Sequence, residues 1–228
     1  MATVTNVLLS GIVGSTAYGL ATADSDVDRL GLFAQPTEKV LGLYPPAQSV
    51  VHTNPDVTFH EAGKFVSLAL KCNPTITELL WLPEDLYETR TELGDELIAI
   101  RKSLLSSGLV RNAYLGYATQ QFRRLENRGD GSFSADTRKR TAKHARHLAR
   151  LVDQGYLLYV EGEYNVRVTD PGFYRDFGDQ VAAGDIELAK NKIASVEKVM
   201  NVTDSALPER PDYNRAQQWL LDVRKEFW

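Results

Sequence analysis

The sequence predicts an α/β domain with a short mixed sheet, followed by an all-helical domain. In the first part of the chain, short apolar runs rich in β-branched residues alternate with short helical segments. Beyond about Leu93, apolar residues recur almost throughout at the three- and four-residue spacing of amphipathic helices. The 228 residues are enough for both domains, which we expect to span residues 1–95 and 96–228.

The first domain is expected to contain four strands and three helices. Apolar runs bounded by glycine or proline predict the strands, and a change to helical spacing after Glu61 predicts two of the helices. In chain order we expect a strand over 4–13, a short helix over 15–20, a strand over 26–36, two strand pieces either side of a turn at Asn54-Pro55, a helix from Glu61 to about Asn73, and a helix over 75–82.

The second domain carries four apolar stripes at helical spacing, within residues 113–125, 145–159, 186–200 and 216–227. The glycine-rich and polar segment 128–137, between the first two stripes, predicts a mobile loop within residues 123–139. The segment 164–173 predicts a short strand followed by a Pro-Gly turn.

The composition is that of an ordinary globular protein, with 43% hydrophobic and 25% charged residues. A net charge of −4 gives no overall basic field for nucleic acid, although local basic patches remain compatible with it. The single cysteine, Cys72, excludes an internal disulfide and suggests a reducing compartment; we expect it to be buried and structural. The N-terminus lacks a basic segment and no apolar run is long enough to span a bilayer, so a cytoplasmic protein without a membrane segment is expected.

Two aspartates, Asp26 and Asp28, follow a Gly-Ser turn formed by Gly14 and Ser15. Residues i and i+2 of a strand point to the same side, so both carboxylates are expected to face one point while Val27 faces the core. Close carboxylates repel each other unless a cation offsets the repulsion, and the oxygen-preferring ions Mg²⁺ and Mn²⁺ suit such a pair. Backbone N–H groups at a strand-to-helix turn suit a phosphate chain. This pattern favours nucleotide chemistry over a solvated acidic turn.

A two-metal phosphoryl-transfer site needs a third carboxylate, and Asp56 at the start of a strand-like segment is the best candidate. Glu61 is second, because we expect it in the first turn of the following helix. Other site types are excluded by their spacing. A calcium loop starting at Asp24 would need glycine where Arg29 stands; no Rossmann or P-loop glycine pattern occurs, and no His or Cys pair has zinc spacing.

These residues resemble the DNA polymerase beta-like nucleotidyltransferase superfamily, whose signature is a Gly-Ser turn, a D-x-D pair and a later acidic strand. The run from Gly14 to Gly31, followed by the segment 56–81, resembles more specifically a subgroup of predicted bacterial and phage nucleotidyltransferases. The resemblance implies that Gly14 and Ser15 hold the triphosphate. It implies that Asp26 and Asp28 bind the metals, and that Asp56 is a third metal ligand or the base for the attacking hydroxyl.

A basic amphipathic helix is expected over residues 138–150, where only Asp136 offsets six Lys and Arg between Ser134 and Arg150. Lys143, His147 and Arg150 are spaced to share one face, which could reach the β- and γ-phosphates or follow an RNA backbone. The subgroup carries a lysine and an H-x-x-R pattern here, which Lys143, His147 and Arg150 match. For the remaining cations of the helix we favour a solvated face.

The sequence therefore predicts a metal-dependent nucleotidyltransferase with two Mg²⁺ or Mn²⁺ ions and a nucleoside triphosphate as substrate. An RNA 3′ end is the first acceptor to test, on the strength of the basic helix alone. Three alternatives stay open: transfer to a protein or small-molecule hydroxyl, an antitoxin-like protein that binds a protein partner, and a nucleic-acid-binding module with an incidental acidic cluster. All three acidic positions are occupied, which argues against an inactive scaffold.

Overall fold

The computed structural model describes residues 4–23, 25–126 and 135–228. They form two compact units, one made of the chain up to Ser106 together with Arg210–Trp228 (the sheet unit), the other of Ser107–Glu209 (the helical unit). The sheet unit is thus discontinuous in sequence, and its bounds differ from the division that we expected near residue 95. The assignment of catalysis to one domain stays a prediction.

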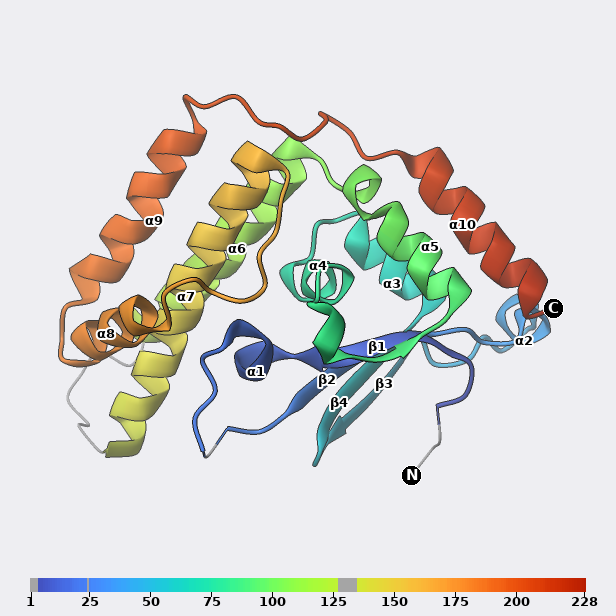
Figure 1. Ribbon diagram of the computed structural model, residues 1–228, viewed down its shortest axis with the longest axis horizontal. Coiled ribbons are helices and arrows are strands. Elements are labelled where there is room, and N and C mark those ends of the chain that lie inside the picture. The colour runs from blue at the N-terminus through green and yellow to red at the C-terminus, as the bar shows by residue number, and fades with distance from the viewer. Residues whose placement is uncertain (1–3, 24, 127–134) are drawn as a thin grey trace. The chain divides into compact units, whose positions relative to one another are not determined.

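The sheet unit contains a five-stranded mixed sheet with the strand order β3-β4-β2-β1-β5 (Figure 1). Strand β2 runs parallel to β4, whereas the other neighbouring pairs are antiparallel. The strands are β1 (Val7–Val13), β2 (Asp28–Phe33), β3 (Ser49–Thr53), β4 (Asp56–Glu61) and β5 (Tyr87–Arg90). The expected mixed α/β sheet followed by helices is confirmed, although β5 was not among the strands that we expected.

Helices α3, α4 and α5 lie on one face of this sheet, and α10 packs against α3 and α5 (Figure 1). The core between them contains the alternate strand residues Leu9, Leu30 and Leu32, each at most 2% exposed. The helical segments of this unit are α1 (Gly14–Tyr18), α2 (Thr37–Leu41), α3 (Ala62–Ala69), α4 (Pro74–Leu80), α5 (Glu92–Ala99) and α10 (Tyr213–Glu226), with 3₁₀ turns at Glu84–Leu86 and Arg101–Leu104.

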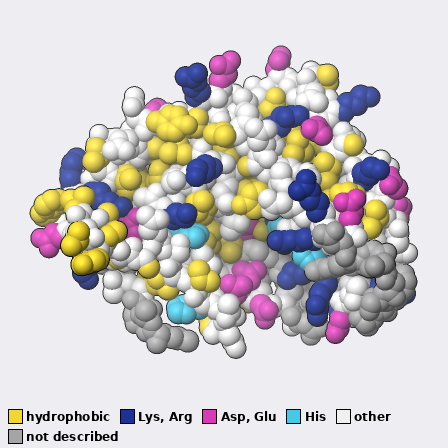
Figure 2. All heavy atoms as spheres, turned by 180° about the vertical axis from the view of Figure 1, so that it is seen from behind, with side chains coloured by type: hydrophobic (Ala, Val, Ile, Leu, Met, Phe, Trp, Pro, Cys, Tyr) yellow, Lys and Arg dark blue, Asp and Glu magenta, His cyan; other side chains and the backbone are white. Residues whose placement is uncertain are grey.

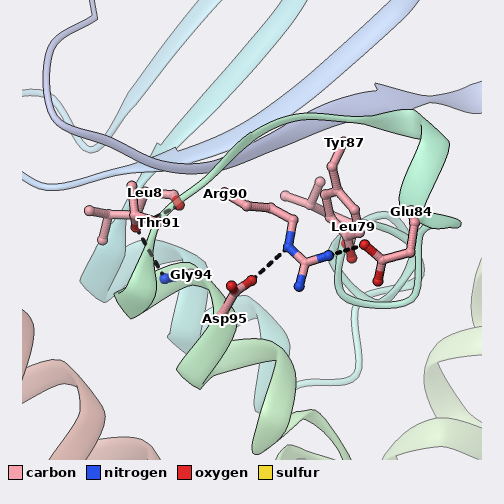
Figure 3. A network of polar contacts seen from close by, with 8 residues as sticks. All are labelled: Leu8, Leu79, Glu84, Tyr87, Arg90, Thr91, Gly94 and Asp95. Carbon is pink, nitrogen blue, oxygen red and sulfur yellow. Dashed lines mark hydrogen bonds and ion pairs between the residues drawn. The ribbon is translucent and has the colours of Figure 1, made fainter.

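A polar network fixes β5 and α5 against β1 and α4 (Figure 3). The backbone N–H and the hydroxyl of Thr91 both donate to the Leu8 carbonyl, at 3.0 and 2.9 Å. Arg90 bridges Asp95 and Glu84, and the Tyr87 hydroxyl donates to the Leu79 carbonyl at 2.8 Å. The last bond anchors the C-terminal end of α4 to the edge of the sheet.

Helix α10 is tied to the sheet by an ion pair between Arg224 and Glu61 at 2.5 Å. Glu61 is also the N-cap of α3, since its Oε2 accepts a hydrogen bond from the Gly63 N–H at 2.7 Å. The Thr37 hydroxyl and N–H donate to the carbonyls of Arg224 and Phe227. The contacts of α10 with Glu61 and Thr37 join residues more than 160 positions apart, which explains why local sequence spacing assigned α10 to the other domain.

The helical unit consists of α6 (Ser107–Glu126), α7 (Ala135–Glu161), α8 (Pro171–Ala182) and α9 (Ile186–Met200), and α7 contacts the other three. The strand expected within residues 164–173 is wrong: Pro171 and Gly172 open α8, and the Asp170 carboxylate caps its N-terminus. Of the loop expected over 123–139, residues 123–126 and 135–139 are instead helical, in α6 and α7, and residues 127–134 lie outside the described part of the chain.

Two further features are the absence of a membrane-spanning helix from the described residues and a group of exposed apolar side chains. Within the described ranges, no helix has the length and apolar character needed to cross a bilayer. Around α2 and the loop after it, apolar side chains are exposed, with Leu41, Leu43 and Tyr44 between 69 and 87% accessible. Hydrophobic side chains also gather at the left edge of Figure 2.

Candidate nucleotide and metal site

The Gly-Ser pair lies at a strand-to-helix junction, as the sequence predicted. Strand β1 ends at Val13 and α1 begins at Gly14, whose φ of +71° is a conformation that favours glycine. A Cβ atom at Gly14 would also collide with the Asp28 carboxylate. The turn therefore requires glycine twice over, and its backbone lies directly against the carboxylate of Asp28.

The two aspartates of the D-x-D pair have different environments. Asp28 is the first residue of β2 and is half-buried, whereas Asp26 precedes the strand and is exposed. The expectation that the strand begins at Asp26 with Val27 facing the core is wrong, because Val27 is 38% exposed and precedes the first paired residue, Asp28. Within the pair, only Asp28 has the fixed position of a strand residue.

Asp56 lies at the same end of the sheet as Asp28. In the parallel pairing of β2 with β4, the first paired residues are Arg29 and Val57, so Asp28 and Asp56 occupy matching positions just before them. Neighbouring strands are about 5 Å apart, and residues in register point to the same face. The strand register therefore brings together two carboxylates that are separated by 28 positions in the sequence.

Glu61, the second candidate for the third carboxylate, is at the opposite end of β4 and is 5% exposed. Its two oxygens bind Gly63 and Arg224. This carboxylate caps a helix and pairs with a cation, so its contacts are those of a structural residue.

The donor set suits a hard divalent cation, because Asp26, Asp28 and Asp56 offer only carboxylate oxygens. Within residues 4–23, 25–126 and 135–228, no three His, Cys, Asp or Glu side chains are arranged to hold a metal ion. Asp24, which also belongs to this loop, lies outside the described residues. The three aspartates are chemically suited to Mg²⁺ or Mn²⁺. The strand register places two of them, Asp28 and Asp56, at the same end of the sheet.

A residue that the sequence reasoning missed, Glu78 on α4, contacts the turn directly. Its Oε1 accepts a hydrogen bond from the Gly14 N–H at 2.7 Å, and its Oε2 accepts one from the Tyr18 hydroxyl at 2.5 Å. The Gly14 N–H was expected to be available to phosphate, and that expectation is wrong, since a protein carboxylate already accepts this bond. A sequence signal existed: Glu78 is the one charged residue in the apolar run of residues 75–82.

The basic helix is present as part of α7, but its cations differ in exposure. Arg138, Lys139, Arg140 and Lys143 are exposed, His147 is half-buried, and Arg150 is only 2% exposed. The shared open face expected for Lys143, His147 and Arg150 is therefore wrong at Arg150. Three helices contact α7, so its C-terminal half is enclosed more widely than a single apolar stripe suggests.

Arg150 belongs to a buried polar network. Its guanidinium donates to the Gln154 side chain at 2.5 Å and to the His147 Nδ1 at 3.0 Å, and the Tyr164 hydroxyl also donates to Gln154. Burial, followed by the nearby positive charge of Arg150, lowers the pKa of His147 to about 3. His147 is therefore neutral at pH 7, and its Nδ1 acts as an acceptor.

Figure 2 shows one face of the molecule, on which Lys and Arg side chains are interspersed with Asp and Glu. This mixed pattern agrees with a slightly negative net charge of −4. The exposed cations of α7, Arg138, Lys139, Arg140 and Lys143, are therefore a local basic group and not part of a general positive field.

Comparisons with known proteins identify a family and find similar solved structures. The model of the RlaP family, described as the RNA repair pathway DNA polymerase beta family, matches residues 2–163. This match confirms the resemblance to polymerase beta-like nucleotidyltransferases. A crystal structure of a nucleotidyltransferase-like protein from Exiguobacterium sibiricum 255-15 is similar over 97% of this chain and 75% of that one, with 12% identity and a TM-score of 0.32, which is too low to support any argument. The comparison with curated proteins found no match.

Proposed function

Because the chain belongs to the RNA repair pathway DNA polymerase beta family, we propose that it transfers a nucleoside monophosphate from a nucleoside triphosphate to an acceptor hydroxyl. The observation that supports this most is the meeting of Asp28, Asp56 and the Gly14–Ser15 turn at one end of the sheet. In the reaction, the acceptor oxygen forms a bond to the α-phosphorus, the bond from that phosphorus to the bridging oxygen breaks, and pyrophosphate leaves.

We propose separate roles in this reaction for the aspartates, the Gly-Ser turn and the basic helix. Asp26, Asp28 and Asp56 would hold two Mg²⁺ or Mn²⁺ ions, which supply positive charge for the phosphate oxygens. Asp56, which is exposed at the start of β4, would also accept the proton of the acceptor hydroxyl. Ser15, beside Gly14, would bind the triphosphate through its N–H and hydroxyl. Lys143 is the proposed phosphate contact of the helical unit, because Arg150 is buried and the His147 Nδ1 accepts a hydrogen bond from Arg150.

An RNA 3′ end is the acceptor that we propose. The description of the family names an RNA repair pathway, and α7 presents four exposed cations, Arg138, Lys139, Arg140 and Lys143. Lys and Arg on one stretch of helix can follow a phosphate backbone, and such binding weakens as salt increases. The exposed cations, and not the buried Arg150, are the ones that would contact RNA.

The test is a label-transfer assay. Purified protein is incubated with each α-labelled nucleoside triphosphate, Mg²⁺ or Mn²⁺, and RNA, total protein or small alcohols as acceptors. We expect label on RNA with the wild type and none with the Asp28→Asn variant. Asp176→Asn, an exposed aspartate on α8, is the matched control and should transfer normally.

The outcomes separate the candidate functions. Label on a protein or a small alcohol, but not on RNA, would keep the reaction and replace the acceptor. Nucleotide binding without transfer to any acceptor, together with a stoichiometric protein partner on purification, would favour a partner-binding protein. Transfer by Asp28→Asn at the wild-type rate would contradict the proposed site.

A further inference from the structure

Glu78 is a buried carboxylate that holds both ends of α1. It is 2% exposed, and its oxygens accept hydrogen bonds from the N–H of Gly14, the first residue of this helix, and the hydroxyl of Tyr18, the last. A charged group this deeply buried is stable only when its hydrogen bonds are satisfied. One side chain from α4 therefore ties a five-residue helix that is too short to be stable alone.

Helix α4, which carries Glu78, is itself held in place at both ends. Asn73 caps α4 by accepting hydrogen bonds from the N–H groups of Thr75 and Ile76, and Pro74 is its first residue. The Leu79 carbonyl, next to Glu78 in the chain, accepts from the Tyr87 hydroxyl on β5 (Figure 3). Helix α4 is thus fixed to the edge of the sheet beside the residue that reaches α1.

Gly14 is held from two sides. Glu78 accepts its N–H, and Asp28 lies so close to its Cα that no Cβ would fit. Movement of the turn would either break the hydrogen bond from the Gly14 N–H to Glu78 or press Gly14 against the Asp28 carboxylate. The position of the turn relative to the Asp28 carboxylate is therefore set by Glu78.

We infer that Glu78 is a positioning residue, which fixes the Gly14–Ser15 turn at the distance from Asp28 that nucleotide transfer requires. This inference rests on the proposed function, but its structural part can be tested without any activity. Because Glu78 occupies the Gly14 N–H, contacts to the triphosphate begin at Ser15. Glu78 itself touches neither substrate nor metal in this scheme.

Three variants separate geometry from charge. In Glu78→Gln, the amide oxygen can accept from the Gly14 N–H and the amide nitrogen can donate to the Tyr18 oxygen, so both contacts are retained without the charge. Glu78→Ala removes both contacts and leaves the Gly14 N–H unsatisfied. Tyr18→Phe removes one contact and keeps the carboxylate. Glu38→Ala, at an exposed glutamate of α2, is the matched control.

The first measurement is hydrogen exchange in peptides that cover residues 13–20. We expect exchange at Gly14 to rise at least tenfold in Glu78→Ala, and by less than threefold in Glu78→Gln and in Glu38→Ala. Exchange that is unchanged in Glu78→Ala would overturn the inference, whether or not the protein transfers nucleotides. If Glu78→Ala does not fold, Tyr18→Phe carries the test, with an expected rise of at least threefold.

The second measurement is the kinetics of label transfer together with nucleotide affinity. We expect Glu78→Ala to raise KM and Kd for the nucleotide at least tenfold and to lower kcat, and Glu78→Gln to restore both to within threefold of the wild type. A wild type that neither binds nor transfers nucleotides would contradict the proposed function and leave the exchange result standing. An active wild type whose kinetics are unchanged in folded Glu78→Ala would contradict the positioning role.

Discussion

The ion pair between Arg224 and Glu61 gives the sharpest prediction about stability, because it connects α10 to the sheet across 163 positions of sequence. The Nη1 of Arg224 lies 2.5 Å from the Glu61 Oε1, and the two side chains are 16% and 7% exposed. Arg224→Met keeps most of the aliphatic stem but removes the charge, which leaves Glu61 buried without its cation. Breaking a buried pair in this way costs about 3–5 kcal/mol, and partial exposure of Arg224 points to the lower end, about 3 kcal/mol.

The assay is urea unfolding followed by tryptophan fluorescence. All three tryptophans, at positions 81, 219 and 228, belong to the sheet unit, so the signal reports this unit alone. The double variant Glu61→Gln/Arg224→Met should recover more than half of the loss, since a neutral Gln can still accept from the Gly63 N–H. Lys225→Met, at the neighbouring exposed lysine, is the control and should leave the urea midpoint unchanged. A loss in Arg224→Met no larger than in this control would refute the reasoning.

Three other predictions follow from the same contacts. Burial lowers the pKa of His147 from an ordinary 6.5 to about 3, so below pH 6.5 the unfolded chain binds a proton that the folded chain does not. The stability that is present above pH 6.5 is therefore lost as the pH falls toward 3, and the loss is about 2 kcal/mol at pH 5. His147→Gln should abolish that extra loss in urea titrations followed by circular dichroism at pH 7 and pH 5, and equal losses in both proteins would contradict it. Gly14→Ala should destabilise the sheet unit by about 1 kcal/mol more than Gly19→Ala, because both glycines have a positive φ but only Gly14 faces Asp28. Equal urea midpoints for the two variants would contradict this prediction. Arg90→Met should cost less than about 1 kcal/mol, since its partners Glu84 and Asp95 are 83% and 50% exposed, and a loss as large as that of Arg224→Met would contradict it.

The local features of the sheet unit were predictable because they depend on short sequence patterns. Apolar runs marked β1 and β2, the Asn54-Pro55 turn separated β3 from β4, and the Gly-Ser pair marked the start of α1. The strand β5 was not predictable in this way. Its sequence, Tyr87–Arg90, has no apolar run, and its pairing with β1 depends on a partner about 80 positions away.

Arg150 and α10 were misplaced for the same reason, which is that helical spacing shows one buried face of a helix but not how many neighbours the helix has. Arg150 was placed on an open face because it is polar, yet α7 has three neighbouring helices and buries it with Gln154 and Tyr164. Helix α10 has the same amphipathic pattern as the helices of the helical unit. Its long-range contacts assign it to the sheet unit, among them those of Arg224 with Glu61 and of Trp219 with Leu93.

Four acidic residues of the sheet unit, Glu61, Glu78, Asp28 and Asp56, fall into two groups by burial and by partner. Glu61 and Glu78 are at most 5% exposed, and each accepts a hydrogen bond from a glycine N–H at the first turn of a helix. Their oxygens hold backbone in place, so exchanging those partners for a ligand would leave buried donors unsatisfied. Asp28 and Asp56 are half-buried and exposed, and parallel pairing places them at one sheet end. Substitution of the glutamates should therefore change stability and hydrogen exchange first, whereas substitution of the aspartates should change nucleotide transfer in a protein that stays folded.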